Sequence, residues 1–185
     1  KLEFVEAAEL LARRLGIEMP QRYARDPEKA KEGEKKRDLL LSLNSWALQW
    51  FRSNLKSDPH GAAAAYVRKR KIRPDLIEAF QLGFSPDAWQ GLLDAATAKG
   101  FAEDLLVEAG LVVRNAESGR VYDRFRGRLM FPILDHLSRC IGFGGRIIVA
   151  DPEKKQPKYI NSSETPLYQK GKSLYGIYQA QSAIE

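Results

Sequence analysis

Residues 157–178 combine basic side chains, turn-forming residues and tyrosines in one stretch. A lysine ammonium group can pair with a phosphate, and an asparagine amide can hydrogen-bond to a base edge or a sugar hydroxyl. Basic residues interleaved with aromatic rings are the ingredients of a single-strand nucleic-acid site. Charge alone fits a solvated loop equally well, so both interpretations stay open at this point. The residues concerned are Lys158, Tyr159, Asn161, Lys170 and Lys172.

Three arginines at alternate positions form a second basic segment, "DRFRGR". In an extended chain Arg124, Arg126 and Arg128 project from one face. Such a row repels itself unless anions lie over it, and guanidinium groups bind phosphate oxygens in pairs. A neighbouring aspartate or a helix C-terminus could satisfy the same arginines. The segment therefore predicts either an anion-binding face or internal neutralisation.

The glycines of "CIGFGGRIIVA" precede another arginine, Arg146. The run matches neither a dinucleotide-binding fingerprint nor a P-loop. We interpret Gly142, Gly144 and Gly145 mainly as structural, because they permit a tight bend or a close approach of backbone or ligand. They would place Arg146 at the start of the strand that follows.

Other catalytic chemistry has no clear signal in the sequence. There is no Cys/His cluster for zinc, and His60 and His136 are far apart along the chain. No acidic cluster resembles a two-metal site, and nothing marks a nucleophile. The single cysteine, Cys140, lies in an apolar run and is expected to pack as a small hydrophobic residue. We therefore expect neither a catalytic residue nor a metal or other cofactor within this chain.

The composition bounds the class of protein. Among 185 residues, 30 Lys and Arg face 24 Asp and Glu, a formal net charge of +6. That balance permits a polyanionic partner. No stretch approaches the roughly 20 apolar residues of a membrane span, and the start of the chain lacks a signal-peptide pattern. A cytoplasmic, monomeric protein without a membrane partner is expected.

Hydrophobic periodicity divides the chain into a part with helical spacing and a part with strand-like runs. Residues up to about 110 show helical spacing, including a long helix after Pro27 in which Gly33 is a candidate interruption. Short helices are expected to start near Pro74, near Ser85 and near either Phe101 or Ala102. From about 111 to 185, short runs of β-branched and aromatic residues alternate with turns, and a helix begins near Ser173. The fold class expected is α+β: a helical N-terminal half, then a small, mostly antiparallel sheet and a C-terminal helix. The turns "ESGR" and "DHLSR" would connect antiparallel strands.

Taken in order, several motifs resemble one known family. "YDRFRGRLMFPILDHLSRCIGFGGR", "PKYINSSET", "YQKG" and "SLYGIYQA" resemble the N-terminal subdomain of the RNA polymerase domain of bacterial DnaG-type DNA primases. "AAYVRKRKIRPDLIEAFQLGFSPDAW" resembles the helical part of that subdomain. "LEFVEAAELLARRLGI" is similar to the segment that follows the zinc-binding module of this family.

The resemblance implies part of an enzyme that makes short RNA primers on single-stranded DNA for replication. Residues 1–25 would follow the zinc-binding module, and 26–185 would be the N-terminal subdomain, helical to about 110 and sheet-forming from 111. In this family Mg²⁺ belongs to a Toprim subdomain, Zn²⁺ to the zinc-binding module, and helicase contact to a C-terminal domain. All three would lie outside this chain, which would be inactive alone. Its partners would be single-stranded DNA, ribonucleoside triphosphates and the RNA primer.

The family's basic residues carry over position by position. The arginine closing the glycine-rich strand matches Arg146, the Pro-Lys-Tyr-x-Asn motif matches Lys158 and Asn161, and a lysine-glycine pair matches Lys170. A basic residue of the helical part matches Arg70, although the family usually has glycine where Lys71 follows. Ser163 stands where the family commonly has proline. A second tier of expected contacts is Arg124, Arg126, Arg128, Tyr159 and Lys172.

A different class of function explains the charge and the tyrosines as well. A non-catalytic module that binds single-stranded nucleic acid would need the same basic groove. It gives no reason for the order in which the motifs occur.

Overall fold

The computed structural model describes residues 11–12, 14–16, 27–149 and 156–184. The chain divides into two units, 1–36 and 37–185. In the first unit the described part consists of a few helical residues and the first turns of helix α2. Most of the predicted segment 1–25 lies outside the described residues. The second unit contains everything that bears on the proposed site.

The order of elements is helical first and strand-rich afterwards, as predicted. The α+β class is therefore confirmed, and Gly33, the candidate interruption, lies within a continuous α2. The elements are α2 (Pro27–Ser57), α3 (Ala62–Lys69), α4 (Pro74–Ala79), β1 (Gly83–Ser85), α5 (Gly91–Ala98), α6 (Glu103–Glu108), β2 (Val112–Arg114), β3 (Val121–Asp123), β4 (Arg128–Leu134), β5 (Cys140–Ile147), β6 (Tyr159–Asn161), the 3₁₀ turn η2 (Lys170–Lys172) and α7 (Ile177–Ile184).

The described residues form two antiparallel sheets, and the larger one carries β5 and β6, from which several of the predicted site residues come. Its strand order is β1-β4-β5-β6, while β2 and β3 make a separate pair. Both predicted hairpin turns are confirmed, because β2 pairs with β3 and β4 pairs with β5 around them. The register aligns Leu129 with Arg146 and Arg146 with Tyr159. Since residues directly opposite one another share a face, this row projects on one side of the sheet.

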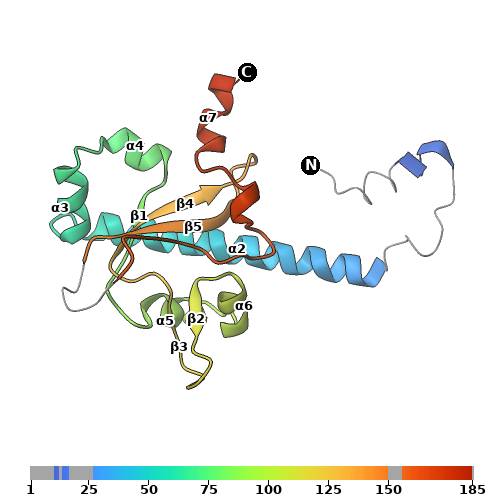
Figure 1. Ribbon diagram of the computed structural model, residues 1–185, viewed down its shortest axis with the longest axis horizontal. Coiled ribbons are helices and arrows are strands. Elements are labelled where there is room, and N and C mark those ends of the chain that lie inside the picture. The colour runs from blue at the N-terminus through green and yellow to red at the C-terminus, as the bar shows by residue number, and fades with distance from the viewer. Residues whose placement is uncertain (1–10, 13, 17–26, 150–155, 185) are drawn as a thin grey trace. The chain divides into compact units, whose positions relative to one another are not determined.

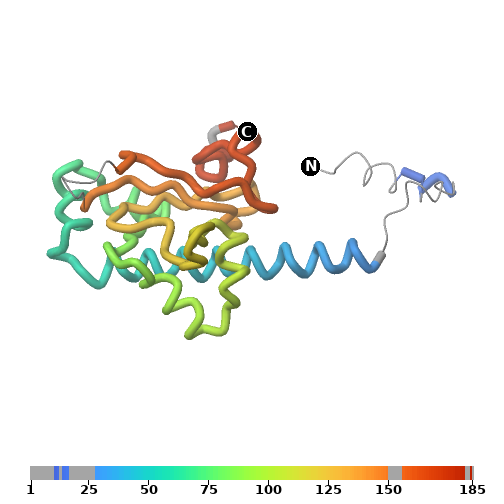
Figure 2. The backbone as a smooth tube through the Cα atoms, turned by 60° about the horizontal axis from the view of Figure 1, so that its bottom comes forward, coloured from blue at the N-terminus to red at the C-terminus, as the bar shows by residue number. Residues whose placement is uncertain are grey.

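The other side of the sheet closes the main hydrophobic core. Met130 and Phe143 pack there with Leu43 and Phe51 of α2 and with Leu92 of α5. Figure 2 shows the strands lying over the light-blue α2, and Figure 1 shows α5 and α6 beside that helix. Cys140 is buried in the same core, and burial raises the pKa of its thiol to about 12. Its predicted packing role is confirmed.

Four short helices end in the same way. In each, the amide of the second residue past the helix bonds to a carbonyl three residues back, and the next amide bonds to one five residues back, which is the Schellman pattern. This ending requires a left-handed residue, which glycine adopts most easily. Gly100 and Gly110 supply it after α5 and α6, whereas Lys71 (φ 53°) and Gln81 (φ 51°) supply it after α3 and α4.

Three predicted boundaries were wrong. "GFS" after α4 forms β1, because Gly83 lies against α2, where a Cβ would approach Phe51 Cβ to 2.6 Å. Ser85 consequently lies inside β1, and its hydroxyl donates to the Phe125 carbonyl at 2.6 Å. Helix α5 therefore begins later, at Gly91. The C-terminal helix begins at Ile177, not near Ser173, because Ser173 is extended (φ −115°, ψ 123°) and Gly176 is left-handed (φ 81°).

Candidate nucleic-acid interface

A groove of about 500 Å³ lies on the face of the sheet away from the main core. Phe131 of β4 and Gly144 of β5 are aligned with Asn161 of β6, and all three line the groove. Tyr159 lines it from β6, and Lys170 lines it from η2. The structure thus brings together three residues predicted from sequence, Tyr159, Asn161 and Lys170, around a hydrophobic floor.

Glycine at positions 144 and 145 keeps this face open. A Cβ on Gly144 would lie 3.2 Å from Asn161 Oδ1, on the face that lines the groove. A Cβ on Gly145 would meet Phe125 Cδ1 at 2.8 Å on the opposite side of the sheet. The glycine run therefore serves both close packing below the strand and an accessible groove above it.

Arg146 extends the basic surface from the groove toward α3. Its guanidinium carbon lies 5.0 Å from the Tyr159 ring centroid and 5.2 Å from that of Tyr66. A guanidinium nitrogen of Arg146 also donates to the Tyr159 hydroxyl. Arg70, at the end of α3, lies over the same Tyr66 ring at 5.4 Å. The two arginines predicted from distant motifs are therefore joined through one tyrosine.

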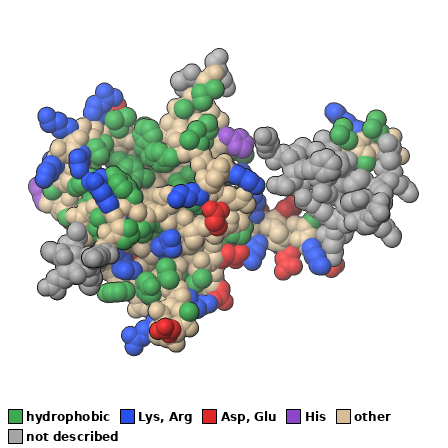
Figure 3. Space-filling view, in the orientation of Figure 1, with side chains coloured by type: hydrophobic (Ala, Val, Ile, Leu, Met, Phe, Trp, Pro, Cys, Tyr) green, Lys and Arg blue, Asp and Glu red, His purple; other side chains and the backbone are tan. Residues whose placement is uncertain are grey.

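The predicted lysines lack carboxylate partners in the described residues. Lys158, Lys170 and Lys172 are exposed, and no described carboxylate lies within ion-pairing distance of their ammonium groups. Glu164, the one acid of that stretch, instead accepts a bond from the Lys170 backbone amide at 3.0 Å. Lys158 stands just before β6 and is not among the residues lining the groove. Figure 3 shows Lys and Arg side chains bordering a hydrophobic patch on this face.

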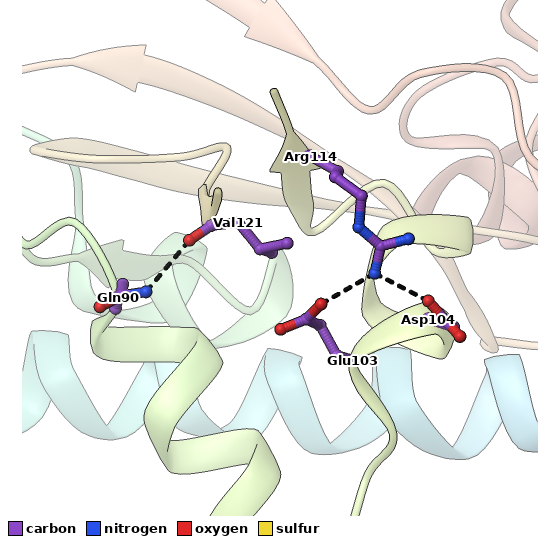
Figure 4. A network of polar contacts seen from close by, with 5 residues as sticks. All are labelled: Gln90, Glu103, Asp104, Arg114 and Val121. Atoms are coloured by element: carbon purple, nitrogen blue, oxygen red, sulfur yellow. Dashed lines mark hydrogen bonds and ion pairs between the residues drawn. The ribbon is translucent and has the colours of Figure 1, made fainter. Parts of the chain in front are cut away.

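Arg114 shows the contrasting arrangement of a neutralised surface cation. Its guanidinium lies 2.8 Å from Glu103 Oε1 and 2.7 Å from Asp104 Oδ1, as Figure 4 shows. Both carboxylates come from the first turn of α6. Arg114 has its anions within the protein, whereas the lysines around the groove have none among the described residues.

The predicted same-face row of Arg124, Arg126 and Arg128 was wrong. Gly127 has φ 59° and turns the chain between them, so the three side chains take different environments. Arg124 donates to the Asn161 carbonyl at 3.0 and 3.2 Å. Arg128 is only 4% exposed and donates to the carbonyls of Gly145 and Pro157. Both therefore support strand β6 from behind, and burial lowers the pKa of both guanidinium groups below its usual value.

Arg126 takes part in an aromatic cluster that the sequence did not single out. Its guanidinium carbon lies 4.2 Å from the Trp89 ring centroid and 5.2 Å from that of Tyr122. Trp89 is 62% exposed and meets Tyr122 edge-on at 5.5 Å. An exposed tryptophan under an arginine is a suitable stacking surface for a base. Trp89 lies in a loop, where hydrophobic periodicity gives no signal, so the sequence did not indicate this cluster.

Asp123 fixes the loop that carries Trp89. It is 2% exposed, and its carboxylate accepts the amides of Leu92 at 2.7 Å and Leu93 at 3.0 Å. Its own amide donates to the Trp89 carbonyl at 2.7 Å. Burial raises the pKa of Asp123 to about 6, despite the opposing effects of the two amides and the Arg126 charge; nearby Asp94 raises it further.

Tyr168 does not provide the stacking surface that the tyrosine-rich stretch suggested. It is 3% exposed and packs with Ile133 and Ile141. Tyr159 remains 58% exposed, and Tyr175 stacks on Phe80 at a centroid distance of 6.0 Å. The groove therefore offers Tyr159 and Tyr175 as aromatic surfaces.

The described residues supply no metal centre. No group of three or more His, Cys, Asp or Glu side chains lies close enough together in the described ranges to hold an ion. Within those same ranges, every helix is too short or too polar to traverse a lipid bilayer.

Comparison with known proteins then decides the family. A family model described as the DNA primase catalytic core, N-terminal domain, matches residues 50–181. The chain belongs to this family. It is also 45% identical, over 183 residues, to a DNA primase of Deinococcus radiodurans, and the match covers 99% of this chain and 29% of that protein. The chain thus spans less than a third of the length of this relative.

Solved structures agree with the family assignment. The structure of a DnaG primase catalytic domain bound to ssDNA matches with a TM-score of 0.71 and 38% identity, covering 81% of this chain and 45% of that one. A structure containing the zinc-binding and RNA polymerase domains of the Aquifex aeolicus primase matches with a TM-score of 0.70 and 29% identity, covering 99% of this chain and 41% of that one. The predicted family and fold are confirmed.

Proposed function

We propose that this chain is the part of a DNA primase that holds nucleic acid and nucleotide phosphates during synthesis of short RNA primers. The observation that carries the proposal is the groove lined by Tyr159, Asn161 and Lys170. Arg146 lies beside the groove, and the lysines around the groove have no described carboxylate within ion-pairing distance. The DNA-bound relative supports single-stranded DNA as one ligand. Ribonucleoside triphosphates and the RNA primer present the same phosphate chemistry.

The role of this surface is positioning and charge stabilisation. Primer extension joins nucleotides by attack of a 3′-hydroxyl on an α-phosphate, and such phosphoryl transfer depends mainly on alignment and on neutralising oxygen charges. Fixed cations near the phosphates cost no rearrangement at the moment of reaction. Tyr159 and Trp89 provide rings on which unpaired bases can stack.

The metal ions of the reaction do not fit the described residues, so we derive no step through them here. We propose that Mg²⁺ and Zn²⁺ belong to other parts of the whole protein, and that the replicative helicase is likewise contacted elsewhere. In this proposal residues 26–185 form one subdomain, which makes no primer by itself. Magnesium-dependent primer synthesis by the 185-residue chain alone would contradict this division of labour.

A salt series tests the binding half of the proposal. Fluorescence anisotropy of this chain with a labelled single-stranded oligonucleotide should show affinity that falls as salt rises, since each phosphate contact releases counterions. Lys170→Ala should weaken binding several-fold and reduce the salt slope by about one. Lys99→Ala makes the same charge change at the end of α5, which packs against the other face of the sheet, and should have little effect. Equal effects of the two substitutions, or binding that ignores salt, would refute the groove.

An activity measurement separates the primase from a simple binding module. In the whole primase, Lys158→Ala should reduce primer synthesis strongly while thermal unfolding stays unchanged. Normal synthesis by this variant would remove Lys158 from the proposed site. A whole protein that binds single-stranded DNA and makes no primer would favour the non-catalytic module.

A further inference from the structure

Tyr66 occupies the point where the helical part of the chain meets the basic side chains of the sheet. It lies in the middle of α3, whose position is fixed by the buried residues Ala63 and Val67. Arg70 follows one turn later, so its side chain returns over the ring. The Arg70 Nε donates to the Tyr66 hydroxyl at 3.1 Å, and its guanidinium carbon lies 5.4 Å from the ring centroid.

Arg146 reaches the same ring from strand β5. Its guanidinium carbon is 5.2 Å from the Tyr66 centroid, and residues 66 and 146 are 80 positions apart in the chain. Two guanidinium groups so close to one ring repel each other. The negative face of the ring offsets that repulsion by attracting each cation. No described carboxylate pairs with either arginine. Tyr159 also holds Arg146, but Tyr66 is the residue that contacts both arginines.

Stacking also decides which part of each guanidinium stays available. A guanidinium that lies over a ring keeps the N–H groups that do not point at the protein for hydrogen bonds to phosphate oxygens. One donor of each arginine is already used, since Arg70 Nε donates to the Tyr66 hydroxyl and a terminal nitrogen of Arg146 donates to the Tyr159 hydroxyl. Arg146 Nε is buried and has no hydrogen-bond partner among the described residues, so the donor left for a phosphate is the second terminal nitrogen of the group. A free arginine side chain would lose rotamer entropy when it binds phosphate, whereas a stacked one has already lost it.

We propose that Tyr66 is a positioning residue for nucleic-acid binding, and that its ring holds Arg70 and Arg146 together as one phosphate-binding pair. The inference rests on the proposed function of the groove. Tyr66 itself need not contact the ligand. It acts through the two arginines, and it links a helix to the sheet surface so that both bind the same strand of nucleic acid.

Graded substitutions of Tyr66 test this role. Tyr66→Leu removes the ring and should weaken single-stranded DNA binding by about three- to tenfold in the anisotropy assay. Tyr66→Phe keeps the ring and loses only the hydroxyl, so binding should stay within about twofold of the original. Equal losses from both variants would refute the stacking argument.

Two controls make the result specific. Ile72→Ala disturbs the hydrophobic cluster that contains Tyr66 without touching either arginine, and it should leave binding unchanged. If Ile72→Ala weakens binding as much as Tyr66→Leu, packing of α3 is the cause and the inference fails. In a chain that carries both Arg70→Ala and Arg146→Ala, Tyr66→Leu should have no further effect. A full additional loss there would also overturn the proposal.

The same experiment separates this inference from the function on which it rests. Arg146→Ala alone should weaken binding of the oligonucleotide and reduce its salt slope. If Arg146→Ala has no effect, the proposed groove is wrong. If Arg146→Ala weakens binding and Tyr66→Leu does not, the groove stands and the positioning role of Tyr66 is refuted.

Discussion

The buried carboxyl of Asp123 makes folding stability depend on pH in a direction that can be measured. Burial raises its pKa to about 6 from an unfolded value of 3.8. Between these pH values the folded chain holds a proton that the unfolded chain has released. The free energy of unfolding therefore falls as pH rises through this window. The contribution is fully present below pH 3.8 and is lost as pH rises through about 6.

A shift of about two pKa units corresponds to about 3 kcal/mol, since each unit is worth about 1.4 kcal/mol. Urea unfolding of the original chain and of Asp123→Asn, measured from pH 4 to 8, isolates this term. Other titrating groups contribute nearly equally to both chains and cancel in the difference. The stability of the original chain relative to Asp123→Asn should decrease by up to about 3 kcal/mol between pH 4 and 7.

The opposite trend would refute this reasoning about Asp123. The amides of Leu92 and Leu93 and the charge of Arg126 all favour the ionised carboxylate, while burial and Asp94 oppose it. If the stability difference grows with pH, the hydrogen bonds and the arginine outweigh burial, and the pKa is lowered. If the difference is flat, the two influences balance.

Two further pairs of substitutions test the backbone interpretation by urea unfolding. Lys71→Gly should stabilise the chain by about 1 kcal/mol, because Lys71 holds a left-handed conformation at φ 53° that glycine adopts freely; Gly100→Ala, at φ 91°, should destabilise it. A loss of stability in Lys71→Gly would contradict the strain argument. Gly145→Ala should cost about 1–3 kcal/mol because its Cβ would lie 2.8 Å from Phe125, whereas Gly171→Ala, with open space around it, should cost little. Equal costs at the two glycines would show that the close contact relaxes freely.

The parts of the fold that sequence could predict are those decided by neighbours along the chain. The turns at 117–120 and 135–139 joined antiparallel strands as predicted, because turn-forming residues and strand-forming runs alternate within a few positions. The family usually has glycine at the position of Lys71, and the structure of the neighbouring residues explains that preference. The helix end requires a left-handed residue there, which is the conformation that glycine adopts most readily.

The predictions that were wrong concern features that depend on contacts between segments distant in the sequence. Arg124, Arg126 and Arg128 do alternate in the sequence, but the left-handed conformation of Gly127 turns the chain and separates their side chains. That conformation depends on the residues that surround Gly127. There a Cβ would come within 2.9 Å of the Val149 carbonyl oxygen. Strand β1 forms because Gly83 fits against α2. The periodicity of a three-residue strand does not reveal such a contact. Tyr168 is buried by residues from β4 and β5. In each case the prediction applied a local rule where a tertiary contact decides the structure.

The arrangement of charge, more than its total, distinguishes the candidate interface. Arg52, Lys56 and Arg73 lie within ion-pairing distance of carboxylates, as do Arg114 and Arg139. These cations contribute to the net charge of +6 and little to the field that a ligand meets, since their partners are only a few ångströms away.

The cations around the groove are held instead by neutral partners. Tyrosine rings hold Arg70 and Arg146. A neutral partner fixes a guanidinium in place without cancelling its charge, so the positive potential stays available to phosphates. Unpaired like charges raise the energy of the free protein, and a bound anion relieves that cost. The proposed phosphate site on this face therefore depends on which partners its arginines do not have.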